Sequence, residues 1–282
     1  MTRTERPPLD TLMCAIEAFE KESGGTISMA ARNLQTGETL TYHADRKVKT
    51  ASVIKLPILV HVALAVREGT QSWDELLILT NEEKVGGSGI LMQLTAGLTL
   101  PLRDVCTLMT VVSDNTGTNM LIEHLGIEPV NARMRELGLR ETTLFRKAYS
   151  PDTPQSKRYG LGVTTAREML RLLALLAQGK IGDARTSAEI IAFLAGQQYR
   201  DMIPRLLPAD WRYAGKTGGL DHVRNDVGIV TAPDGQRFAL ALFCQEIPEV
   251  LWTPDNPGTL ALARLARRLL ARWTELSQDS SP

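Results

Sequence analysis

The chain has 282 residues, of which 43% are hydrophobic and 23% are charged, a composition ordinary for a globular protein. Its 32 Lys and Arg residues balance its 32 Asp and Glu residues, so it lacks the strong positive field by which proteins attract nucleic acids or anionic membranes. No stretch reaches the roughly 18 apolar residues of a transmembrane helix.

The N-terminal segment Met1-Thr-Arg-Thr-Glu-Arg-Pro-Pro lacks the apolar region of a secretory signal. We therefore expect a cytoplasmic protein if Met1 is the native start, and a secreted or periplasmic one if a signal was removed; the compartment stays open. The three cysteines, Cys14, Cys106 and Cys244, are too few and odd in number for a disulfide framework. We expect all three to pack as small apolar groups.

The first third of the chain predicts one helix, a strand pair and a second helix. Helical spacing of apolar residues over Leu12–Lys21 ends at two glycines, and strands are expected at Thr26–Asn33 and Thr39–His43. A long apolar helix is expected from Ser52 to Arg67, with a proline tolerated in its first turn.

The middle of the chain is mostly helical by its pattern, and the end predicts more strands. The clearest helical segments are Leu102–Val112, Asn119–Leu125, Pro129–Leu137 and Thr165–Gln178, followed by strands at Trp211–Thr217, Arg224–Thr231 and Phe238–Gln245 and a last helix over Pro257–Leu276. Strands at both ends with helices between them indicate an α+β fold, with one antiparallel sheet built from both termini. We expect one domain, with a sheet lobe from about 12–50 and 205–276 and a helical lobe of about 51–204.

Three short motifs carry the chemistry: Ser52-Val-Ile-Lys55, Ser113-Asp-Asn115 and Lys216-Thr-Gly218. Each alone is a weak signal, but together, in this order and spacing, they resemble the class A β-lactamases and their penicillin-binding-protein relatives. The resemblance extends from Leu12 to Leu270. It implies a β-lactamase/transpeptidase-like fold and a serine hydrolase that forms an acyl-enzyme without a cofactor or metal.

The catalytic residues expected from the motifs are Ser52, Lys55, Ser113 and Lys216. Ser52 is the nucleophile, and Lys55 either takes its proton or, while charged, orders Ser52 and Asn115. Burial and the neighbouring cation Lys216 would favour loss of the Lys55 proton. Ser113 would relay a proton to the leaving nitrogen, held by the charge of Lys216.

Substrate contacts are expected from Asn115, Thr217, Gly218 and Gly219. The Asn115 amide suits an amide side chain of the substrate. The resemblance implies that Thr217 meets the substrate carboxylate and that the backbone N–H groups of Ser52 and Gly219 form the oxyanion hole.

One residue of the class A pattern is missing. Those enzymes use a glutamate on a loop after the second serine to activate the water that releases the acyl group. Its expected position falls near Ala148, and no glutamate lies between Thr142 and Arg167. Asp152 is the only carboxylate in that window and is more typical of a turn, while Glu141 and Glu168 look misplaced. Acylation should therefore survive, whereas hydrolysis should be slow.

The prediction is a hydrolase acylated at Ser52 by a β-lactam or a D-Ala-D-Ala-like amide or ester, associated with antibiotic resistance and monomeric by the family's default. Two alternatives remain: a DD-peptidase or esterase of the penicillin-binding type, and a penicillin sensor that acylates without turnover. The four histidines are scattered without ligand spacing, so no metal is expected. Arg224 and Asp226 either pair across the floor of the cleft or stabilise their strand.

Overall fold

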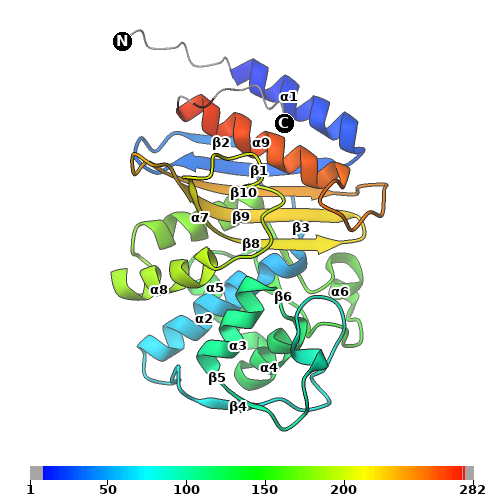
Figure 1. Ribbon diagram of the computed structural model, residues 1–282, viewed down its shortest axis with the longest axis vertical. Coiled ribbons are helices and arrows are strands. Elements are labelled where there is room, and N and C mark those ends of the chain that lie inside the picture. Colours follow the sequence, from blue (N-terminus) through cyan, green and yellow to red (C-terminus); the bar gives the residue numbers. More distant parts are fainter. Residues whose placement is uncertain (1–8, 275, 277–282) are drawn as a thin grey trace.

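The computed structural model describes residues 9–274 and 276, and its central element is a five-stranded antiparallel sheet (Figure 1). The strands lie in the order β2 (Thr39–Tyr42), β1 (Thr26–Asn33), β10 (Arg237–Gln245), β9 (Val223–Thr231) and β8 (Arg212–Leu220). Strand β1 pairs with β10 over its whole length, from Thr26 opposite Gln245 to Asn33 opposite Phe238. The predicted α+β fold, with a sheet from both ends of the chain, is confirmed.

Helices cover both faces of this sheet. Helices α1 (Leu9–Ser23) and α9 (Pro257–Trp273) lie together on one face, and the remaining helices lie on the other (Figure 1). Side chains of β10 alternate accordingly, because successive residues of a strand point to opposite faces. Phe238 and Leu240 join the core under α1 and α9, whereas Ala239 and Ala241 join the core under the other helices.

The segment between the sheet's two halves is largely helical. Its helices are α2 (Lys55–Arg67), α3 (Leu102–Val111), α4 (Asn115–Leu125), α5 (Ile127–Glu136), α6 (Pro154–Tyr159), α7 (Ala166–Ala177) and α8 (Ala184–Ala195). Short 3-10 turns lie at Ala51–Ile54 and Leu91–Gln93. A small three-stranded sheet has the order β3 (Val48–Lys49), β7 (Gly162–Thr164) and β6 (Thr143–Leu144). A two-stranded sheet pairs β4 (Leu76–Ile78) with β5 (Thr99–Pro101). The division into two lobes of one domain stays a prediction.

Several predicted helix bounds were wrong. Residues Ala51–Ile54 form a 3-10 turn, so α2 begins at Lys55 rather than at Ser52. Helix α4 begins four residues earlier than predicted, because the Asp114 carboxylate accepts the backbone N–H of Gly117 and caps it. Helix α9 stops at Trp273, since Thr274 takes an extended conformation and its hydroxyl donates to the carbonyl of Leu270.

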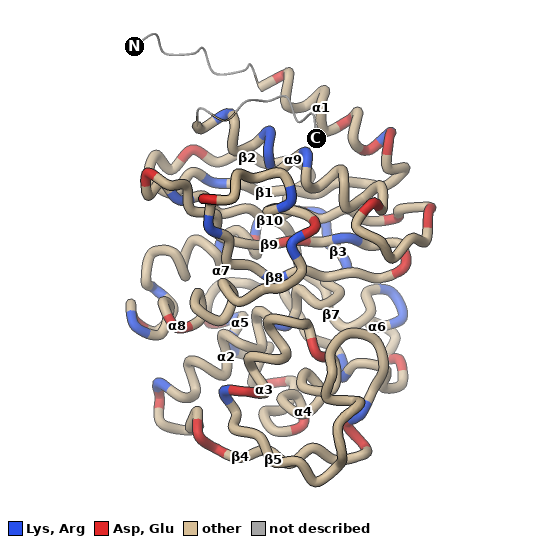
Figure 2. Tube along the Cα trace, viewed as in Figure 1, with Lys and Arg blue, Asp and Glu red and all other residues tan. Residues whose placement is uncertain are grey.

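The described residues carry acidic and basic side chains that are interspersed along the whole trace (Figure 2). None of the helices in the described part of the chain is both long and apolar enough to cross a bilayer. Cys106 and Cys244 are buried as expected, but Cys14 is exposed, so the prediction that all three pack inside was wrong for Cys14.

Candidate active site

Ser52 lies in the 3-10 turn between β3 and α2, where the backbone is tightly held. Ala51, directly before it, has a φ of 46°, a conformation that costs free energy in any residue with a side chain. Gly218 of β8 packs so closely on this turn that a Cβ on it would lie 2.8 Å from the Thr50 carbonyl oxygen and 2.9 Å from the Ser52 nitrogen. The third motif thus contacts the first through backbone, and only a glycine fits.

Lys55 is fully buried and directs its ammonium at the second motif. Its Nζ donates to the carbonyl oxygen of Ser113 at 2.7 Å, to Oγ of Ser113 at 3.1 Å and to Oδ1 of Asn115 at 2.8 Å. Among the described residues, no group is hydrogen-bonded to the Ser52 hydroxyl. For Lys55 to accept the Ser52 proton, it must lose its own charge and exchange one of these three partners.

Ser113 is held between the two lysines. Nζ of Lys216 donates to its Oγ at 3.1 Å, the same distance as Nζ of Lys55, and also to the carbonyl oxygen of Thr217 at 2.9 Å. A hydroxyl that accepts two hydrogen bonds keeps its own proton free to donate. Ser113 also has a φ of 55°, and such strained residues are enriched at functional sites.

The charges of the two lysines oppose each other in a buried site. Burial, and then the positive charge of Lys216, lower the pKa of Lys55 well below its ordinary value, against the influence of Asp114. Burial also lowers the pKa of Lys216 to about 7, although the carboxylate of Asp226 favours its charged form. A neutral Lys55 beside a charged Lys216 is the arrangement that a proton-accepting Lys55 requires.

Thr217, Gly218 and Gly219 lie on β8, the last strand in the sheet order. Among the residues that the structure describes, no further strand pairs with the outer side of β8, which makes it an edge strand of this sheet. Trp252 lies beside Gly219, since a Cβ on that glycine would be 3.4 Å from the indole ring. The same ring covers the guanidinium of Arg224, whose Cζ lies 4.7 Å from the ring centroid.

Asp114 and Asn115 attach the glycine-rich loop Gly86–Gly89 to α4. The Asp114 carboxylate accepts the backbone N–H groups of Ile90 and Leu91, at 2.6 and 2.9 Å. Nδ2 of Asn115 donates to the Gly86 carbonyl at 3.0 Å, while its Oδ1 accepts from Lys55. Asn115 therefore orients Lys55 and ties the loop to the site. We gave Asp114 no role from the sequence, although its place before a helix is a capping signal.

The loop expected to carry the missing glutamate is fixed to α4 at Ala148. Nδ2 of Asn119 donates to the Ala148 carbonyl at 3.1 Å, and the Ala148 N–H donates to Oδ1 of Asn119 at 2.8 Å. Ala148 is buried, with 4% of its surface exposed. The sequence alone did not reveal this pairing, because the two residues lie 29 positions apart.

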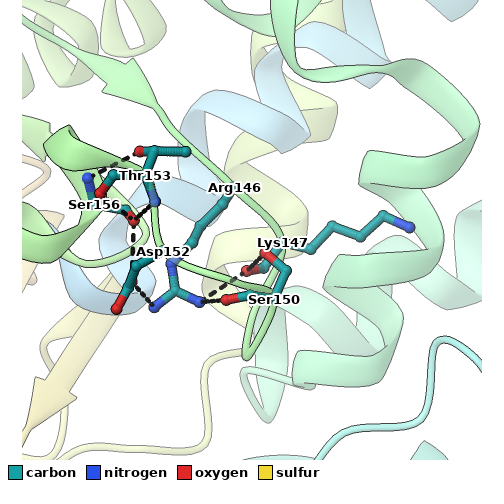
Figure 3. A network of polar contacts seen from close by, with 6 residues as sticks. All are labelled: Arg146, Lys147, Ser150, Asp152, Thr153 and Ser156. Atoms are coloured by element: carbon teal, nitrogen blue, oxygen red, sulfur yellow. Dashed lines mark hydrogen bonds and ion pairs between the residues drawn. The ribbon is translucent and has the colours of Figure 1, made fainter.

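Asp152 forms part of a polar network within the same loop (Figure 3). Its Oδ1 accepts from the Ser156 hydroxyl at 3.0 Å and pairs with Nη2 of Arg146 at 3.2 Å. Thr153 and Ser156 form a capping box at the start of α6. These contacts give Asp152 a structural place at a turn.

The other two acidic residues near the loop are also engaged. Glu141 pairs with Lys47 at 2.5 Å, and Glu168 accepts from the Thr142 hydroxyl at 2.6 Å and from the Glu141 backbone N–H at 2.9 Å. Neither carboxylate bonds to Ser52 or Lys55.

Arg224 and Asp226 do not pair with each other. Arg224 donates to the backbone carbonyls of Leu220, Val223 and Leu251. Asp226 accepts from the Tyr213 hydroxyl and, at 2.9 Å, from the Ile203 N–H. Within residues 9–274 and 276, no three His, Cys, Asp or Glu side chains are arranged to hold a metal ion.

Comparisons with known proteins identify the family of this chain. The model of the beta-lactamase enzyme family matches residues 11–273. A beta-lactamase regulatory protein, BlaB, from Streptomyces cacaoi is 27% identical, with 90% of this chain and 95% of that protein covered.

Two solved structures share the fold over nearly the whole chain. A beta-lactamase from Sphaerobacter thermophilus superimposes with a TM-score of 0.84 at 30% identity, covering 94% of this chain and 98% of its own. A leucine-to-glutamate mutant of PBP-A, solved as the acyl-enzyme complex with penicillin G, gives a TM-score of 0.84 at 26% identity, with 97% and 100% covered. The family match, the fold and the three motifs lead to one conclusion: this chain belongs to the beta-lactamase enzyme family.

Proposed function

We propose that the protein is a serine hydrolase of the β-lactamase type that β-lactams acylate at Ser52 and that releases the acyl group slowly. The observation that carries the proposal is the buried contact of Lys55 and Lys216 with Ser113, beside the turn that bears Ser52. Family membership supports the hydrolase class.

In the proposed acylation, Oγ of Ser52 forms a bond to the lactam carbonyl carbon as the lactam C–N bond breaks. Lys55 in its neutral form takes the hydroxyl proton, and Ser113 passes a proton to the departing nitrogen. The backbone N–H groups of Ser52 and Gly219 would bind the oxyanion; removing one such donor commonly costs about 3–4 kcal/mol of transition-state stabilisation. Thr217 would contact the substrate carboxylate.

Slow release follows from the loop around Ala148. Hydrolysis of the ester needs a base to activate water, and the carboxylates of Glu141, Asp152 and Glu168 are bound to other groups. Two alternatives share this chemistry. A DD-peptidase or esterase is supported by the missing glutamate, and a sensor without turnover is supported by the name of the regulatory relative from Streptomyces cacaoi.

The test is intact-protein mass spectrometry over time after mixing with benzylpenicillin, with Ser52→Ala as the control. We expect a long-lived adduct of one penicillin per chain in the native protein and none in the variant. A penicillin adduct on Ser52→Ala would refute the assignment of Ser52 as the nucleophile. Rapid loss of the adduct with accumulating penicilloic acid would show an efficient β-lactamase. Cleavage of a D-Ala-D-Ala peptide would favour the peptidase.

A further inference from the structure

Tyr149 directly follows Ala148 and differs from it in exposure and in backbone conformation. Ala148 is buried, whereas 69% of the Tyr149 surface is exposed. The φ of Tyr149 is 59°, in the left-handed region that bulky residues rarely adopt. Glycine would adopt this backbone conformation without strain. The presence of a large side chain here therefore suggests a function other than stabilising the fold.

The loop fixes the direction of Tyr149 from both sides. Asn119 holds the Ala148 backbone at both its N–H and its carbonyl. On the other side, Nη1 of Arg146 donates to the Ser150 carbonyl at 2.6 Å, and the Ser150 hydroxyl donates to the Lys147 carbonyl at 3.0 Å (Figure 3). Tyr149 thus projects from a short turn whose ends are both bonded.

The phenol of Tyr149 and the side-chain amide of Asn115 both lie close to Gly87. A Cβ on Gly87 would lie 2.9 Å from the Tyr149 hydroxyl and 2.6 Å from Nδ2 of Asn115. The phenol and the amide therefore flank the same backbone position, which has no side chain to separate them. Oδ1 of this amide accepts from Lys55, so the phenol lies one residue away from the catalytic lysine.

We propose that Tyr149 contacts the substrate and determines its specificity: the ring packs on the acyl side chain of a β-lactam, and the hydroxyl hydrogen-bonds to the amide of that side chain. This inference rests on the proposed function. An exposed tyrosine offers a rigid apolar face and a polar end, which suits acyl groups that combine an amide with an aromatic ring. The preferred substrates are thus acylamino β-lactams rather than those with a bare amine.

The test compares benzylpenicillin, whose side chain is phenylacetamido, with 6-aminopenicillanic acid, which has the same ring system and no acyl side chain. Acylation efficiency is measured for the native protein, Tyr149→Ala and Tyr149→Phe. We expect Tyr149→Ala to acylate with benzylpenicillin roughly three- to tenfold more slowly, a range typical of one aromatic contact. The rate at which Tyr149→Ala reacts with 6-aminopenicillanic acid should equal that of the native protein. The rate of Tyr149→Phe with benzylpenicillin should lie between those of the native protein and Tyr149→Ala.

Leu76→Ala is the matched control, because Leu76 is 62% exposed and lies on β4, at the far end of the helices from the sheet (Figure 1). It should react with both compounds as the native protein does. If Tyr149→Ala loses acylation efficiency equally with both compounds, or with neither, the proposed role of Tyr149 is refuted.

Tyr149→Gly separates recognition from structure. It removes the ring and relieves the left-handed backbone, so its melting temperature should not fall, while the selective loss for benzylpenicillin should remain. A lower melting temperature together with loss for both compounds would assign the ring a structural role and refute the proposal. If neither compound labels Ser52 in the native protein, the proposed function itself is refuted, and this role falls with it.

Discussion

The side-chain amide of Asn119 binds both the backbone N–H and the backbone carbonyl of Ala148. Asn131 binds Leu144 in the same way, with its Nδ2 donating at 2.9 Å and its Oδ1 accepting at 2.8 Å. Helices α4 and α5 thus each hold one point of the segment 144–148. This double attachment places the loop beside the site without a carboxylate at Ala148.

Replacing Asn119 should affect stability and function together. Asn119→Ala leaves the buried N–H and carbonyl of Ala148 without partners, so the free energy of unfolding should fall by about 1–3 kcal/mol in urea titrations. Asn131→Ala should cost a similar amount. Only Asn119→Ala should also slow acylation by benzylpenicillin, because it releases the turn that carries Tyr149. Equal acylation rates in the two variants would contradict this coupling.

A carboxylate at Ala148 should speed release of the acyl group. General bases commonly contribute about 10²–10⁴-fold, and we expect Ala148→Glu to shorten the lifetime of the penicillin adduct by about 10²-fold. Ala148→Gln is the control, because it has nearly the same shape without a base. The lifetimes are read by time-resolved mass spectrometry, and equal values for Glu and Gln would contradict the prediction.

Acylation should decline as the pH rises through about 7. The pKa of Lys216 is lowered to about 7, so above that pH the lysine loses the charge that holds Ser113. Lys216→Arg keeps its charge to high pH, so the decline near pH 7 should disappear even if the maximum rate is lower. Rates of adduct formation between pH 5 and 9 provide the measurement. A profile unchanged by the substitution would assign the decline to another group.

Stability should depend on pH through Asp226. Burial raises its pKa to about 7, against an ordinary value of 3.8, despite the bonds from Tyr213 and Ile203. Below about pH 4 the carboxyl is neutral in both states. Between pH 4 and pH 7, Asp226 ionises in the unfolded chain but stays mostly neutral in the folded protein. The free energy of unfolding therefore falls as the pH rises through this range.

Asp226→Asn removes this titration. The free energy of unfolding of the variant, minus that of the native protein, should rise by on the order of 2–4 kcal/mol from pH 5 to pH 8. Urea unfolding of both proteins at the two pH values measures the difference, in which the titration of other groups largely cancels. A difference that stays constant with pH would place the pKa of Asp226 near its ordinary value.

Local patterns predicted most elements of the fold. The three long strands near the C-terminus and helix α7 appeared within a few residues of their bounds, because alternation and helical periodicity are properties of neighbouring residues. Helix α8 was missed. The start of α2 was misplaced because Ser52 lies in a 3-10 turn, against which Gly218, distant in sequence, packs.

The three motifs could likewise be recognised in the sequence, whereas the contacts between them could not be predicted from it. The sequence by itself determined the family, the α+β class and the absence of a glutamate in the loop, since these depend on residue identity and order. Only the tertiary structure decided that Lys55 binds Ser113 and Asn115 instead of Ser52, and that Ala148 is held by Asn119 with Tyr149 turned toward Asn115. Such pairings join residues tens of positions apart, and they arise from packing that no local preference specifies.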